Sequence, residues 1–286
     1  NCLANRFGDE GLATLLTAIE GTSVRSLCGL TEGQTTADFS GQNLSPIDCK
    51  ILAAEYDFRG FIAAVESIDL SGCGLTGATK NRFGNWQKID SNMDGFIALC
   101  AVLGKVRTVR LADCGLGASS VAELSKIFSD ATAAVERVIL KSNYITGSKY
   151  ARGWKYDLDM SGFTTFCEAL PAAKTLRFLD LSECRLSVKA VNEIAKAVSA
   201  GAGVARVVLS GNAITDGDKD LSGLTALCEA LLAAKNLTAI DFSNCGIKVK
   251  GVNEIAKAVS AGSAGIVSLN CLANRFGDEG LATLLT

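Results

Sequence analysis

Acidic side chains recur at alternating positions just before three predicted helices, in a spacing that can chelate a metal ion. Two stretches share the order Asp-x-Asp-x-Ser-Gly with a Glu seven residues after the Ser, and a third opens as Asp-x-Asn-x-Asp-Gly but has Ala101 at the last place. Alternate carboxylates can converge on one hard cation while Gly allows the sharp turn, so the pattern predicts calcium sites. Their ligands are Asp157, Asp159, Ser161 and Glu168; Asp218, Asp220, Ser222 and Glu229; and Asp90, Asn92 and Asp94.

These stretches resemble the calcium loop of EF-hand proteins, but they lack its incoming helix, and Ser161 and Ser222 stand where a carboxylate is usual. A second interpretation is helix capping. Ser161, Ser222 and Asp94 occupy the place of an N-cap residue, and acidic residues just before a helix favour its dipole. The sequence leaves both interpretations open, and calcium is the only cofactor that it indicates.

Aromatic and basic residues gather in two insertions of the chain. Tryptophan, tyrosine and arginine together are typical of protein interfaces, and their rings can also stack on sugars or bases. The alternative is that each insertion folds back over its own helix ends. The candidate binding residues are Arg82, Phe83 and Trp86 in the first insertion and Tyr150, Arg152, Trp154 and Tyr156 in the second.

The composition excludes several classes of function. The 286 residues contain no His, which removes Ser–His and Cys–His catalysis and His-based zinc sites, and no group of base, nucleophile and oxyanion donors stands out. We therefore expect no enzyme. A net charge of −2 argues against binding nucleic acid by bulk electrostatics. The longest uncharged run, Ala258–Asn274, has 17 residues and is interrupted by Gly, Ser and Asn, so no membrane span is expected.

A short segment of alternating apolar residues, closed by Asn or Cys, recurs along the whole chain. One copy runs Val65, Ile68, Leu70, Cys73 and Leu75. The alternation predicts a short strand with one buried face, and a helical pattern follows each copy. The closing residue should satisfy buried backbone groups in stacked turns. This ladder consists of Asn5, Gln42, Cys73, Cys114, Asn143, Cys184, Asn212, Cys245 and Asn274.

The repeated segment resembles the leucine-rich repeat family, in particular its ribonuclease-inhibitor-like type with alternating long and short units. The resemblance covers essentially all of residues 1–286 as a single domain. It implies an α/β fold, namely a right-handed solenoid with parallel strands on the concave face and helices on the convex face. We expect the ladder to be buried and the insertions of the long units to protrude along one edge.

A longer period overlies the short one. Residues 1–17 are identical to residues 270–286, so the shift is 269 residues, and it equals four pairs of units of 68, 70, 69 and 62 residues. The chain starts within a predicted strand and stops within a predicted helix. We therefore expect one complete 269-residue unit, residues 1–269, of a tandem array or fibre, whose partners are proteins, chiefly further copies of itself.

The eleven Cys fit a core better than a disulfide framework. Four belong to the ladder, four more (Cys49, Cys100, Cys167 and Cys228) hold the inward helix position that Leu12 holds elsewhere, and no C-x-x-C motif is present. Unpaired buried thiols slightly favour an intracellular setting, while the compartment stays unknown. The functional hypotheses are a structural scaffold and, as the alternative, a recognition module that binds a protein or glycan through the concave face or the aromatic insertions.

Overall fold

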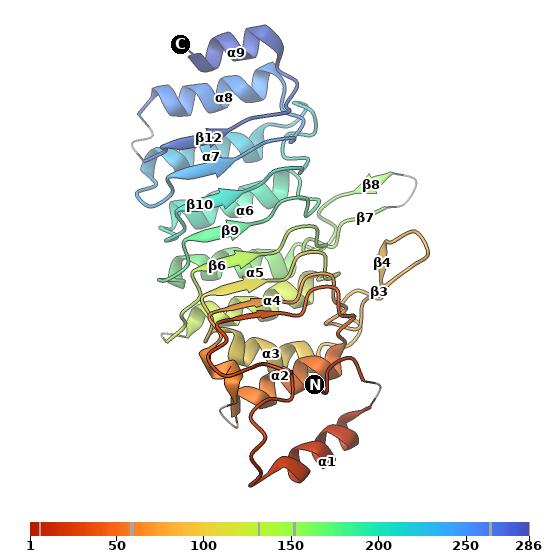
Figure 1. Cartoon of the computed structure of the whole chain (residues 1–286). Coiled ribbons are helices and arrows are strands. Elements are labelled where there is room, and N and C mark those ends of the chain that lie inside the picture. The colour runs from red at the N-terminus through yellow and green to blue at the C-terminus, as the bar shows by residue number, and fades with distance from the viewer. Residues whose placement is uncertain (6, 58–59, 131, 151–152, 263–264, 286) are drawn as a thin grey trace.

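Parallel strands of successive units form one continuous sheet along the molecule (Figure 1). The computed structural model describes the chain apart from residues 6, 58–59, 131, 151–152, 263–264 and 286. Within the described residues, eight strands pair strictly in chain order, each parallel to its neighbours. They are β1 (Thr36–Asp38), β2 (Ser67–Asp69), β5 (Thr108–Arg110), β6 (Arg137–Ile139), β9 (Phe178–Asp180), β10 (Arg206–Val208), β11 (Ala239–Asp241) and β12 (Ser268–Asn270).

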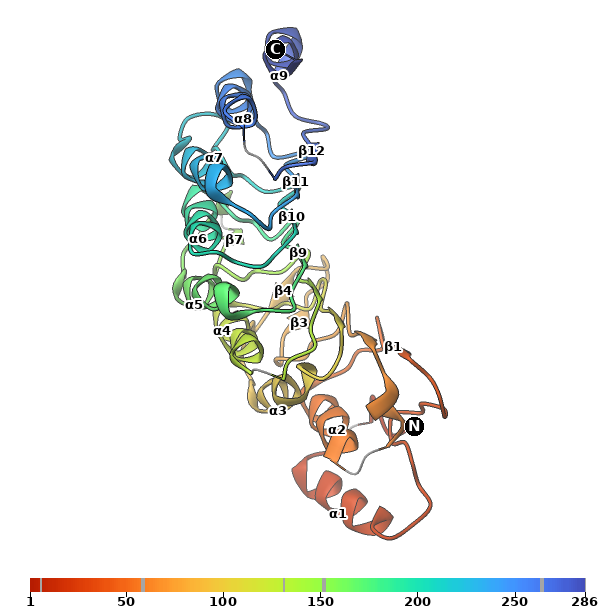
Figure 2. The ribbon, with the colours of Figure 1, turned by 90° about the vertical axis from the view of Figure 1, so that its left-hand side faces the viewer.

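Helices cover the other face of the sheet, and Figure 2 shows them on the outer, convex side of the curved stack. The α-helices are α1 (Asp9–Ile19), α2 (Pro46–Asp57), α3 (Asp94–Leu103), α4 (Ala118–Ser125), α5 (Ser161–Ala169), α6 (Val188–Ser199), α7 (Ser222–Ala233), α8 (Val249–Ser260) and α9 (Gly277–Leu285). Short 3-10 helices follow some of them: η1 (Phe61–Ala64), η2 (Lys126–Ser129) and η3 (Leu170–Ala172). The predicted α/β solenoid, with strands inside and helices outside, is confirmed.

The core lies between sheet and helices because each strand points its middle residue inward. Ile68, Val109 and Leu179 are fully buried, and they meet apolar helix residues such as Val121 and Val191. Burial of each such side chain stabilises the fold by about 1.5–3 kcal/mol relative to leaving it in water. A single unit has nothing to pack its faces against, so the core exists only because units stack.

The ladder residues join neighbouring turns through hydrogen bonds. Asn143, 1 % exposed, accepts from the backbone N–H of Cys114 and of Leu116, each at 3.0 Å. Its amide donates to the carbonyls of Leu111 and Leu140 at 2.7 and 2.8 Å. Its side chain thus serves four backbone groups at once.

The predicted burial of the ladder holds within the stack and fails near the N-terminus. The interior members are buried, Asn274 is half-buried, and Asn5 and Gln42 are exposed. Asn5 donates to the carbonyls of Cys2 and Leu3, and Gln42 to that of Asp38, so both serve their own turns only. The buried members are Cys73, Cys114, Asn143, Cys184, Asn212 and Cys245.

All eleven cysteines are unpaired thiols, as expected, and all but Cys2 and Cys271 are buried. The ladder thiol of Cys184 donates to the Leu140 carbonyl at 3.1 Å, which is the role that the amide of Asn143 fills one unit earlier. Desolvation by burial raises the pKa of the Cys184 thiol to about 12. These groups therefore stay protonated and act as small apolar side chains.

Two of the long-unit insertions form antiparallel hairpins that leave the stack along one edge (Figure 1). The first consists of β3 (Thr79–Lys80) and β4 (Trp86–Gln87), and the second of β7 (Lys149–Tyr150) and β8 (Trp154–Lys155). The third insertion, residues 213–221, forms turns. None of the helices in the described part of the chain is long and apolar enough to cross a membrane.

Candidate functional site

Three aspartates of the acidic stretches hold the N-terminus of a helix in the following unit. Asp90 serves α4, Asp157 serves α6 and Asp218 serves α8. The N-cap residues of these helices, Gly117, Ser187 and Lys248, supply no side-chain cap of their own. The first four N–H groups of a helix lack partners within it, so a carboxylate from elsewhere satisfies them and also favours the helix dipole.

Asp157 shows the arrangement most completely. It is 6 % exposed, and its Oδ2 accepts from the backbone N–H of Ser187 and of Ala190, both at 3.2 Å. The Ser187 hydroxyl donates to the same oxygen at 2.6 Å. Ala190 is the third residue of α6, so a single carboxylate serves the N-cap and third positions.

The other two aspartates repeat this geometry. Asp90 accepts from the N–H of Gly117 and of Ser120, both at 3.1 Å, and also from the Ser120 hydroxyl. Asp218 accepts from the N–H of Lys248 at 3.0 Å and of Gly251 at 2.9 Å. Capping between units is therefore a regular feature of this solenoid.

The capping interpretation was right in kind and wrong in its residues. Ser161, Ser222 and Asp94 are the first residues of α5, α7 and α3, and no side chain caps these helices at the N-cap position. The second acidic position makes a local turn: Asp159 and Asp220 accept from the N–H and hydroxyl of the serine two residues on, and Asn92 accepts from the N–H of Asp94. Hydrogen bonds from the Ser222 hydroxyl and N–H hold the pKa of Asp220 below its usual range.

The candidate calcium ligands do not converge on one point. Glu168 and Glu229 are exposed on their helices. Among the described residues, no group of three or more Asp, Glu, Cys or His side chains is placed to hold a metal ion. The carboxylates of Asp90, Asp157 and Asp218 already accept hydrogen bonds from helix N–H groups, so the observed donor set fits capping rather than a cation.

The first hairpin folds back onto the next unit. Trp86 is 9 % exposed, its indole N–H donates to Asp113 Oδ1 at 2.7 Å, and Lys80 pairs with Asp113 Oδ2 at 2.7 Å. The Lys80 ammonium also lies 4.6 Å from the centre of the Trp86 ring. The ring packs against Gly115, where an added Cβ would lie only 2.8 Å from it. Any side chain at residue 115 would therefore push Trp86 away.

The second hairpin solves the same packing problem with an arginine. Arg185 stands one residue after the ladder Cys, as Gly115 does, and its guanidinium lies 4.4 Å from the centre of the Trp154 ring. Tyr150 meets the Trp154 ring edge-on with ring centres 5.7 Å apart. The candidate binding residue Arg152 lies outside the described residues.

The two indole rings are thus partly covered, and the accessible aromatic surface of the hairpins lies elsewhere. Phe83 and Tyr150 are each 70 % exposed, and Tyr156 is 38 % exposed. Arg82 stacks on Phe83 at 4.6 Å from the ring centre. Both interpretations of the insertions therefore hold in part, because the tryptophans cover the stack and the outer rings face solvent.

The concave sheet carries a second exposed cluster, which we name the concave cluster: Arg137, Phe178 and Arg206 on β6, β9 and β10. These residues are in register across the three strands. The guanidinium of Arg137 lies 4.0 Å from the centre of the Phe178 ring and that of Arg206 lies 5.8 Å from it, on neighbouring strands. The sequence analysis missed Phe178, although its place two residues before Asp180 aligns it with both arginines.

The aspartates of the neighbouring column have local work. Asp38, Asp69, Asp180 and Asp241 occupy one register position of the sheet. Each accepts from the N–H of the serine two residues on and so shapes the turn after its strand. Burial alone would raise the pKa of Asp241, but hydrogen bonds from Ser243 and Asn270 and the charge of Arg206 outweigh it and leave that pKa below its usual range.

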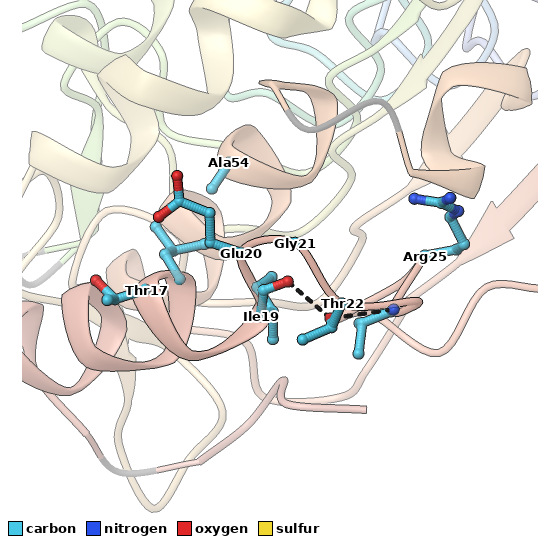
Figure 3. Close-up of a pocket in the computed structure, with 9 residues that line it drawn as sticks. Thr17, Ile19, Glu20, Gly21, Thr22, Arg25 and Ala54 are labelled. Carbon is cyan, nitrogen blue, oxygen red and sulfur yellow. Dashed lines mark hydrogen bonds between the residues drawn. The ribbon is translucent and has the colours of Figure 1, made fainter.

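A pocket of about 640 Å³ lies beside the C-terminal end of α1 (Figure 3). Its lining mixes a few polar groups with aliphatic side chains and offers no nucleophile beside a base. The lining residues are Leu16, Thr17, Ile19, Glu20, Gly21, Thr22, Val24, Arg25 and Ala54.

Comparison with known proteins gives distant relatives. No family model matches the chain. A bovine protein named NACHT, LRR and PYD domains-containing protein 5 is 28 % identical over 181 residues, which are 63 % of this chain and 15 % of the relative. The mouse ribonuclease inhibitor is 24 % identical over 315 aligned positions, covering 93 % of this chain and 68 % of the inhibitor. An internalin structure from Listeria monocytogenes aligns over 96 % of this chain and 91 % of its own, with 12 % identity and a TM-score of 0.36.

Proposed function

We propose that this leucine-rich repeat solenoid is a non-catalytic scaffold for protein–protein contacts and part of a longer tandem array or fibre. Its repeat pattern, its parallel sheet and its sequence relatives identify the fold as that of leucine-rich repeat proteins. The mouse relative is by name an inhibitor of an enzyme, so its target is a protein, which supports a protein partner here. The chain spans only 15 % of the bovine relative's length.

One observation carries the array. The identical segments 1–17 and 270–286 occupy equivalent places in the solenoid, since Ala4 and Ala273 both adopt φ 59° in the turn and a helix follows each. Four pairs of units separate them, so a second 269-residue unit continues the stack in phase. An array built this way buries each open unit against the next.

The hairpins suit lateral contacts within such an assembly. Phe83 and Tyr150 project from the same edge, two units apart, with Arg82 stacked on Phe83. Exposed aromatic rings beside arginine are typical of interface centres. In the proposal they meet a neighbouring array.

The mass of the natural polypeptide tests the array. We expect a chain that contains several 269-residue units, as read by intact mass spectrometry or from the full coding sequence. A natural chain close to the 29.7 kDa of this sequence, monomeric in solution, would contradict it.

The concave cluster favours a second candidate function, recognition of one protein ligand. Arg137 and Arg206 are exposed, Phe178 holds them in place, and Ile139 and Val208 add apolar surface on the same strands. Guanidinium groups held in this way favour a partner segment that carries carboxylates. The covered indole rings of Trp86 and Trp154 make a glycan the less suitable ligand, since stacking on sugars needs free ring faces.

Affinity capture with the full chain and an R137E/F178A variant separates the two candidates. A recognition module loses its bound protein with this variant, whereas a scaffold that assembles through its hairpins loses assembly with F83S/Y150S instead. Both pairs of residues are half-buried or exposed, so neither variant should disturb the fold.

A further inference from the structure

The two identical segments, residues 1–17 and 270–286, are buried on opposite sides. Leu3 is 7 % exposed, whereas its counterpart Leu272 is 74 % exposed. Leu12 is 7 % exposed, whereas its counterpart Leu281 is 50 % exposed. Since the sequences are the same, the difference lies only in what covers them.

The uncovered leucines of the second segment belong to a packing face. Leu281 stands seven residues after its ladder residue, and Val121, Val191 and Val252 stand at the same distance after theirs. These three valines are at most 1 % exposed, because the next unit covers them. Leu281 therefore presents a surface that every interior equivalent buries.

The first segment shows which surface covers this face. The Ala4 N–H donates to Oδ1 of the buried Asp48 at 2.7 Å, and Asp9 pairs with Lys50 at 2.6 Å. The Cys2 N–H donates to the Leu27 carbonyl at 2.6 Å. We call the surface around Leu27, Asp48 and Lys50 the acceptor surface.

The second segment is bound on its other side. Asn274 Oδ1 accepts from the N–H of Cys245 and of Ile247, each at 3.0 Å, and β12 pairs with β11. The equivalent Asn5 is exposed. Segment 270–286 is thus anchored by its own chain and free to present its leucines, while the acceptor surface holds a segment of identical sequence.

We propose that residues 270–286 of one molecule dock on the acceptor surface of a second copy of this chain, in place of that copy's residues 1–17. Ala273 then donates to Asp48 of the second copy, Asp278 pairs with its Lys50, and Leu272 and Leu281 become buried. Strand β12 comes to lie beside β1, whose outer edge pairs with no strand of the described residues, and the sheet continues from one molecule into the next.

A balance of contacts sets the direction of this exchange. The resident segment has the advantage of being tethered, with an effective concentration in the millimolar range. The incoming segment adds the β12–β1 pairing, because residues 1–3 form no strand against β1. The exchange does not depend on the proposed array, since it concerns association between separate chains.

Matched substitutions in the two identical segments test the proposal on the full chain. Sedimentation velocity over a range of concentrations should show head-to-tail association of the wild-type protein. L272E/L281E, at positions exposed in the monomer, should abolish it. L3E/L12E changes the same residues in the resident segment, and it should strengthen association with wild-type chains roughly tenfold or more by weakening the competitor.

Two further variants protect the result from trivial explanations. Asp9→Lys breaks only the exposed ion pair with Lys50 and should strengthen association in the same direction, without placing a charge in the core. Phe83→Ser, far from both ends of the stack, should leave head-to-tail association unchanged. Wild-type and L3E/L12E chains that both remain monomers, or association that survives L272E/L281E, would overturn the exchange. Neither result bears on the mass of the natural polypeptide, which tests the array.

Discussion

The carboxylate of Asp157 and the hydroxyl of Ser187, thirty residues apart in sequence, lie 2.6 Å from each other where one unit of the solenoid ends its insertion and the next begins its helix. The same carboxylate accepts from two backbone N–H groups of α6. The N-terminus of α6 is therefore completed by the unit before it, and the predictions below begin from this link.

Replacing Asp157 by Ala should lower the free energy of unfolding by about 1–3 kcal/mol, because the donors at the start of α6 lose their acceptor in a buried site. Chemical denaturation monitored by circular dichroism measures the change. Asp159→Ala is the matched control. Asp159 is exposed and bonds only to Ser161, so its loss should cost well under half as much. Equal losses from the two variants would contradict capping across units.

Calcium should not raise the unfolding temperature. To bind the ion, Asp157 and Asp218 would have to leave the N–H groups of α6 and α8, and Glu168 and Glu229 would have to turn in from the surface. A ligand held only by the native state raises its stability, so differential scanning calorimetry with calcium and with chelator reads the outcome directly. A rise with calcium that D157N/D218N removes would establish the calcium sites and set capping aside.

Asn143→Ala should cost about 3 kcal/mol or more, because four buried backbone groups lose their partner together. Thermal unfolding of the variant measures this cost. Gln42→Ala is the control, since Gln42 is exposed and bonds only within its own turn, and its effect should stay within about 0.5 kcal/mol. A mild effect at Asn143 would mean that the ladder follows the stacking rather than supports it.

Stability should fall steeply as the pH rises above 9. Burial raises the thiol pKa of Cys184, Cys228 and Cys245 to about 12, against an ordinary 9.0. The unfolded chain then loses thiol protons above pH 9, while the folded chain keeps them until about pH 12, so each thiol costs about 1.4 kcal/mol at pH 10. Burial raises the pKa of five further deeply buried thiols, Cys28, Cys49, Cys100, Cys114 and Cys167.

Eight such thiols together remove on the order of 10 kcal/mol at pH 10, which is the size of a whole domain's stability. Denaturant titrations under reducing conditions between pH 7 and pH 11 measure the loss. C167V/C228V should unfold at a higher pH than the wild type, since these positions accept an aliphatic residue where the first unit has Leu12. A midpoint that does not vary from pH 8 to pH 10 would contradict the argument.

The strands, the unit boundaries and the buried ladder could be predicted because their signals are local. Alternation at Val138 and Leu140 and a closing Asn143 lie within a few residues, and repetition makes each unit support the others. The partners of the insertions could not be predicted in this way. Asp90 meets Ser120 thirty residues later and Trp86 meets Asp113 twenty-seven residues later, so each contact depends on the stacking register and on how the insertion turns back.

Phe178 escaped prediction for a related reason. On its own strand it is one apolar residue among several, and only alignment with β6 and β10 sets it between Arg137 and Arg206. The four-residue difference between insertions that end in Trp86 or Trp154 hides their equivalence in the same manner. Gly115 and Arg185, which accommodate the two rings, follow the ladder Cys directly and were the available signal.

Capping across units also bears on how such a gene can lengthen or shorten. Loss of one unit from the middle of the chain would leave Asp157 without a helix to complete, or α6 without its acceptor. Loss or duplication of a long unit together with the short unit after it keeps every carboxylate beside its helix, and the junction then falls at a contact of the Asn143 kind, which all pairs can remake. Recombination that preserves folding should thus proceed in steps of about seventy residues, and the 269-residue duplication, four pairs long, obeys that rule.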